Sequence, residues 1–129
     1  MGIAKKFAAL LGVAAIATGV AAPSDGRHTE QAVIIHFAYG SRDLQRLFTL
    51  EDQLEAAVAK AGVGQYDGNE AAVDGSDGYL YMYGPSADRL FEVVRPILES
   101  THFMRGAKMK KRYGPAQAGI KEVIVVIQP

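Results

Sequence analysis

Residues 78–98 read GYLYMYGPSADRLFEVVRPIL, and this stretch joins a strand pattern directly to a helix pattern. Tyrosine occupies positions 79, 81 and 83, and Leu80 and Met82 stand between them. Side chains alternate between the two faces of a strand, so we expect a strand at 79–83 with the tyrosines on one face. Ser86 is a typical N-cap, and the apolar residues after it recur at helical spacing. The second half therefore predicts a helix, which Pro96 should kink or shorten.

The rest of the chain supplies one more helix and four more strands. The strands are expected at 32–39, 65–73, 107–113 and 121–127, where β-branched and aromatic residues are frequent. Between the first two, apolar side chains from Leu47 to Ala61 follow a helical spacing. Thr49 and Asp52 resemble a capping box, whereas Leu44 and Leu47 would fit the same stripe in a helix that extends back to Asp43, so the start stays open. Gly62 provides the left-handed stop. The DGSDG stretch at 74–78 predicts a hairpin turn.

The resulting order is β-α-β-β-α-β with one additional β-strand. This order predicts an α+β protein with a ferredoxin-like βαββαβ two-layer sandwich and an additional C-terminal strand. If both crossovers are right-handed, the two helices cover the same face of the sheet. Leu80 and Met82 are the natural contacts for the helices, which leaves the tyrosines on the opposite, open face. The pattern of the first strand does not decide which of its faces meets the helices.

Length and composition predict one domain preceded by an export segment. The chain has 129 residues, no cysteine and a formal net charge of zero. Residues 1–22 hold two lysines, no acid and sixteen uncharged residues in a row, which indicates a signal peptide or an N-terminal membrane anchor. We expect a linker at 23–31, a ferredoxin-like domain at 32–129, and a periplasmic or extracellular location. Residues 23–129 carry 12 basic and 14 acidic side chains, which does not favour a global nucleic-acid or membrane-surface field.

The open face is the predicted binding site of a module that has no catalytic role. Ferredoxin-like domains often associate through this face, and a row of tyrosines provides contact area with polar ends. The apolar run VIVVI at 123–127 also needs a cover, for which a second copy of the chain is the simplest choice. The expected partner is a second copy or another protein. The predicted binding residues are Tyr66, Tyr79, Tyr81, Tyr83, Arg112 and Tyr113.

A second hypothesis is nucleic-acid binding. The DGYLYMY stretch at 77–83 resembles the third-strand signature of the RNA-recognition motif, whose aromatic side chains stack on bases. Asp77 stands where that family has a basic residue, and Leu80 where it has a small one. Basic residues at 105–112 would supply positive charge near the tyrosines.

A third hypothesis is a small hydrolase-like enzyme that uses Asp67, Glu70 and His36. It requires these side chains to converge, and a bulge at Gly68 would be needed to bring the two acids together. The three histidines, at 28, 36 and 102, form no metal-ligand spacing, and the chain has no phosphate-binding or dinucleotide-binding loop. The sequence therefore predicts no cofactor and no metal.

One local resemblance concerns the stretch YDGNE at 66–70, which follows an amphipathic helix and a short glycine-containing link. It is similar to the second half of the B-type regulator of ribonuclease E activity and its relatives. In that family a Tyr-Asp-Gly stretch begins a strand of a ferredoxin-like domain that binds protein. The wider pattern also resembles small bacterial exported proteins. The resemblance implies a fold and a binding module without catalytic residues.

Overall fold

The computed structural model describes residues 30–128. The expected signal peptide or anchor at 1–22 lies outside the described residues, as does the linker from 23 to 29. Within the described part of the chain, no helix combines the length and the apolar character that a membrane crossing requires.

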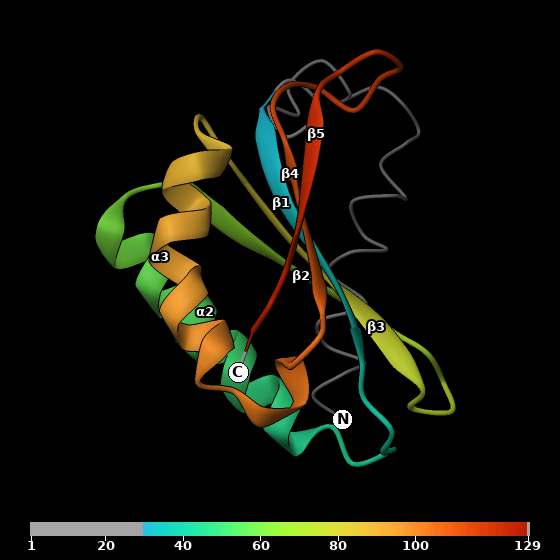
Figure 1. The fold of residues 1–129 in the computed structure, drawn as a ribbon. Coiled ribbons are helices and arrows are strands. Elements are labelled where there is room, and N and C mark those ends of the chain that lie inside the picture. The colour runs from blue at the N-terminus through green and yellow to red at the C-terminus, as the bar shows by residue number, and fades with distance from the viewer. Residues whose placement is uncertain (1–29, 129) are drawn as a thin grey trace, which may run out of the picture.

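The described residues form an α+β structure in which two helices lie on one face of a five-stranded antiparallel sheet (Figure 1). The strands follow the order β2-β3-β1-β4-β5, with β1 in the centre. This arrangement is compatible with the expected sandwich, and the additional strand β5 pairs with β4 at one edge. The elements are β1 (Gln31–Ala38), α2 (Gln45–Ala61), β2 (Gln65–Ala71), β3 (Asp77–Gly84), α3 (Ala87–Glu99), η4 (His102–Met104), β4 (Lys108–Arg112) and β5 (Glu122–Val126).

The core lies between the sheet and the helices. Leu80 and Met82 of β3 are fully buried against it, as expected from the sequence. The register pairs Ile35 with Leu80 and Val33 with Met82, so these β1 residues share the helix-covered face. That register decides which side of β1 meets the helices, a choice that the sequence pattern left open.

The helix ends follow their local sequence in two places out of four. Ser86 caps α3, where its Oγ accepts a hydrogen bond from the Arg89 N–H at 3.2 Å, and Gly62 ends α2 with φ of 66°. Helix α3 continues through Pro96 to Glu99. The expected capping box at Thr49 is wrong, because α2 already begins at Gln45 and the Thr49 hydroxyl donates back to the Gln45 carbonyl. The apolar stripe therefore extends one turn further towards the N-terminus than the cap signal indicates.

The hairpin between β2 and β3 is fixed by Gly75. Its φ is 78°, and the Ser76 N–H donates to the Asp74 carboxylate at 2.9 Å, which confirms the turn expected at DGSDG. The carbonyl of Gly75 accepts hydrogen bonds from the N–H groups of Gly40 and Ser41. The hairpin is therefore tied to the end of β1.

Candidate functional site

The sheet face opposite α2 and α3, called the open face from here on, carries an ordered grid of side chains. In antiparallel strands, residues directly opposite each other project to the same side. The register therefore sets out three rows across the sheet, one strand per position. From β2 to β5 they are Glu70–Tyr79–His36–Lys108–Val126, then Gly68–Tyr81–Ile34–Lys110–Ile124, and, from β3 onward, Tyr83–Ala32–Arg112–Glu122.

The tyrosine row lies on the open face, as the sequence predicts. Tyr79 is 39 % exposed, and its ring stacks on His36 with centroids 4.4 Å apart. The Tyr79 and Tyr81 rings are also near parallel, with centroids 6.2 Å apart. Because the rings stand side by side, their edges and hydroxyl groups form the outer surface. The result is an aromatic ridge along β3 that extends to His36 on β1.

Two side chains of this ridge, Tyr81 and His36, contact acidic side chains on the same face. The Tyr81 hydroxyl donates to the Glu70 carboxylate, and burial together with this contact raises the pKa of Tyr81. His36 Nε2 lies 2.8 Å from the Asp77 carboxylate. Both contacts place a negative charge on the β2 and β3 side of the open face.

Basic side chains occupy the other side of the same face. Lys108, Lys110 and Arg112 alternate along β4 and are paired in register with His36, Ile34 and Ala32. The Arg112 guanidinium carbon is 5.9 Å from the centre of the Tyr83 ring, so this predicted rim residue does lie on the open face. Its Nε donates to the Gly114 carbonyl at 2.7 Å, which holds the side chain against the sheet. Lys111 points the other way, towards Asp88 of α3.

The expected place of Tyr66 on the open face is wrong. Tyr66 pairs in register with Met82, so its side chain lies on the helix-covered side. Its hydroxyl donates to Glu51 of α2 at 2.5 Å, and Asn69 donates to the same carboxylate oxygen at 2.7 Å. The β-bulge between Tyr66 and Gly68 changes the alternation, so Asn69 follows Tyr66 on that side, three residues later.

The expected place of Tyr113 is also wrong. Its hydroxyl donates to the Asp88 carboxylate of α3 at 2.6 Å, so it belongs to the helix side. The hydrogen bonds from Tyr113 and Lys111 hold the pKa of Asp88 below its ordinary value. Tyr113 directly follows Arg112, the last residue of β4, and the alternation of the strand continues to it, so the two side chains lie on opposite faces.

The three residues of the enzyme hypothesis do not converge. Glu70 and His36 stand in the same row with Tyr79 between them, which separates them by two strand spacings, or about 10 Å. A bulge is present between Tyr66 and Gly68, but Glu70 contacts Tyr81 and His36 contacts Asp77. Among residues 30–128, no three acidic or histidine side chains are placed to hold a metal ion.

Sequence reasoning missed the buried carboxylate of Glu51. It is fully buried in α2 at the centre of the contact with β2. A signal was present, since Leu47, Glu51 and Leu54 follow the helical spacing of the apolar stripe. A polar residue at such a position indicates a buried partner, and the polar stretch at 66–70 supplies it.

Comparison with known proteins does not assign this chain to a family. No protein-family model, curated protein or solved structure matches the chain. The function must therefore be argued from the grid of side chains on the open face.

Proposed function

We propose that this protein is a non-catalytic binding module of the ferredoxin-like type, and that its open face binds a second copy of the chain. The single observation that carries the proposal is that aromatic and cationic side chains lie on opposite sides of β1. Aromatic rings on β3 and cations on β4 lie at equal distances on either side of this central strand. A surface of this kind is complementary to itself.

A two-fold axis between the faces, parallel to β1, would place β3 of each copy over β4 of the other. Each row would then meet the same row, so that Tyr79 faces Lys108 and Tyr81 faces Lys110. Arg112 of the third row is buried, and its guanidinium donates to the carbonyls of Gly114 and Glu30 in its own copy. Sheets packed in this way cross at about 30° because of their twist. Because the hydroxyl groups lie at the outer surface of the ridge, the cations would meet chiefly the tyrosine oxygens, which accept hydrogen bonds. A cation that reaches a ring face contributes about 0.5–2 kcal/mol, most when water is excluded. Ile34 would lie on the axis against its own copy.

The charge balance favours a protein partner over a nucleic acid. The open face carries three cations, Lys108, Lys110 and Arg112, but also three acids, Glu70, Asp77 and Glu122. The presence of lysines and tyrosines on one face is the observation that keeps single-stranded nucleic acid as a second candidate. Binding of labelled single-stranded RNA that weakens steeply with salt would support that candidate.

Light scattering on the full chain tests the proposed function. The variant Tyr81→Lys keeps a favourable contact with Glu70 within the copy, but it places a cation against Lys110 of the other copy. We expect association through the open face to weaken by roughly 100-fold, the equivalent of about 2.7 kcal/mol. Val73→Glu, at the exposed tip of the hairpin, is the matched control and should leave the mass unchanged. An unchanged mass for both variants would contradict the proposal.

A further inference from the structure

The two edges of the sheet differ in how well they resist pairing with another strand. The β2 edge contains the bulge at Asp67 and polar side chains such as Gln65 and Glu70. The β5 edge has no register shift, proline or charge from Val123 to Val126. Ile124 and Val126 are 56 % and 44 % exposed. Bulges and charges are the usual protection of an edge strand. β5 has no bulge, and its one charged residue, Glu122, stands at its first position.

The backbone of β5 is oriented for such pairing. Lys121 accepts from the Tyr113 N–H at 3.0 Å, and Ile127 donates to the Ala107 carbonyl at 2.9 Å. Alternate residues point their N–H and C=O groups to the same side of a strand. Odd-numbered residues of β5 therefore point to β4, and Ile124 points its N–H and C=O groups outward. Within residues 30–128 no strand pairs with this edge.

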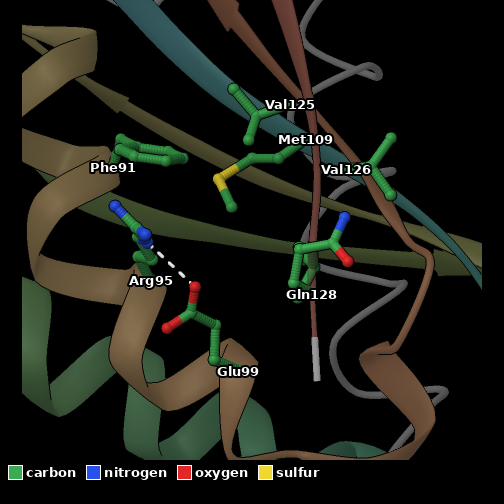
Figure 2. Close-up of a pocket in the computed structure, with 8 residues that line it drawn as sticks. Phe91, Arg95, Glu99, Met109, Val125, Val126 and Gln128 are labelled. Atoms are coloured by element: carbon green, nitrogen blue, oxygen red, sulfur yellow. Dashed lines mark hydrogen bonds and ion pairs between the residues drawn. The ribbon is translucent and has the colours of Figure 1, made fainter.

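A hollow of about 180 Å³ lies beside β5 on the helix side of the sheet. Figure 2 shows Phe91, Arg95 and Glu99 of α3 facing Met109 and Val125 across it. Arg95 Nε donates to Glu99 at 2.9 Å, and both side chains line this hollow together with Ile127 at the C-terminal end of the strand. The helix side of β5 is thus bordered by α3 and carries a carboxylate at one end.

We propose that β5 is an interface with a second copy of the chain, in which the two β5 strands pair antiparallel with Ile124 opposite Ile124. The register then places Val123 opposite Val125 of the other copy and Glu122 opposite Val126. Each outward N–H and C=O group of Ile124 gains a partner. Apolar side chains meet on both faces of the joined sheet, which suits a strand that is apolar on both sides.

Charge complementarity identifies a second copy, and this register, as the occupant. On the helix side, Lys121 of one copy lies opposite Ile127 of the other, where Glu99 borders the hollow. On the open face, Glu122 of one copy lies opposite Val126, and Lys108 stands next to Val126 in the same row. Glu122 also lies 3.6 Å from Lys110 of its own copy, so it would be shared between the two lysines. Lys108 forms no ion pair within residues 30–128. The two-fold symmetry repeats both charge pairs.

This interface joins the β5 edges and leaves the aromatic ridge of the open face uncovered. Its two-fold axis is perpendicular to the sheet, so the open faces of the two copies lie on the same side of one continuous sheet. Each remains available to the partner argued above. The two interfaces together predict an assembly larger than a dimer, and either one alone predicts a dimer.

Two substitutions separate the interfaces in the full chain. Ile124→Pro removes the outward N–H and blocks pairing at the edge, while the bonds from β5 to β4 use the odd-numbered residues. By light scattering, we expect Ile124→Pro to remove the β5 contact and Tyr81→Lys to remove the open-face contact, so that each variant leaves a dimer. The double variant should be a monomer of 13.8 kDa. If Ile124→Pro leaves the mass unchanged at every concentration, the β5 proposal is wrong, whatever the result for Tyr81→Lys.

Charge-reversal variants distinguish a loss of the interface from a loss of folding. Lys121→Glu alone and Glu99→Lys alone should each weaken association by about tenfold, because they place like charges together in two symmetric positions. The combination of both reversals should restore the affinity of the unmodified chain. A combination that remains as weak as the single variants would overturn the proposed register. A restored affinity also shows that the single variants are folded.

Discussion

Tyr66 and Glu51 join the edge of the sheet to the helix layer through a hydrogen bond of 2.5 Å. Glu51 is fully buried, and Asn69 donates to the same oxygen. A buried carboxylate is stable only when its hydrogen bonds compensate for the loss of water. This contact therefore fixes β2 against α2 and accounts for the position of Tyr66 away from the open face.

The first prediction concerns the Tyr66 hydroxyl. Tyr66→Phe removes one hydrogen bond to a buried charged group, so we expect the free energy of unfolding to fall by about 1–3 kcal/mol. Tyr79→Phe is the matched control, because Tyr79 lies on the exposed side of the sheet. It should change stability by less than about 0.5 kcal/mol. Urea denaturation measures both, and equal effects would show that the contact with Glu51 contributes little.

The second prediction concerns how the free energy of unfolding falls at alkaline pH. Burial, and then the negative charge of Glu51, raise the pKa of Tyr66 above its ordinary value of 10.0. The folded state holds this proton more tightly, so the contribution is complete below pH 10 and is lost as the pH rises above it. We expect a loss of about 1.4 kcal/mol per pH unit from this group above that pH. Denaturation as a function of pH should show a flatter decline for Tyr66→Phe, and parallel curves would contradict the prediction.

The third prediction compares the cost of an alanine substitution at two glycines that have the same φ. Gly40 and Gly75 both have φ of 78°, but a Cβ at Gly75 would lie 2.1 Å from the Ser41 carbonyl oxygen, whereas at Gly40 it meets nothing within 4 Å. Gly40→Ala should cost about 1–2 kcal/mol, which is the strain of a left-handed residue. Gly75→Ala should cost more, because the hairpin must also move away from the end of β1. Thermal unfolding compares the two, and similar melting temperatures would rule out the close approach.

The fourth prediction concerns Asp88 and Tyr113. The Tyr113 hydroxyl is the main cause of the lowered pKa of Asp88, followed by Lys111. A lowered pKa in the folded state means that the stabilising contact is present above the ordinary value of 3.8 and is lost as the pH falls through the folded value. Tyr113→Phe should raise the pKa of Asp88 in an NMR titration of the carboxyl carbon. Lys121→Gln, which leaves the hydroxyl in place, should have the smaller effect.

Local sequence patterns were sufficient to predict which residues are buried and where helices end in elements with one buried face. The alternation in β3 assigned Leu80 and Met82 to the core, and Gly62 and Ser86 marked helix ends correctly. These predictions depend on residues close together in the sequence, where sterics and capping act directly. The sequence did not decide the start of α2, because a cap signal at Thr49 lies inside the helix. Packing of the earlier turn overrides that local preference.

The sequence by itself determined the order of helices and strands, the two faces of β3 and the turn at DGSDG, because alternation, helical spacing and positive φ act over a few residues. Tertiary structure alone decided that the lysines at 108 and 110 share a face with the tyrosines, whereas Tyr66 and Tyr113 do not. Those assignments depend on the register between strands distant in sequence and on one bulge. A shift of a single residue in either would turn each side chain to the opposite face.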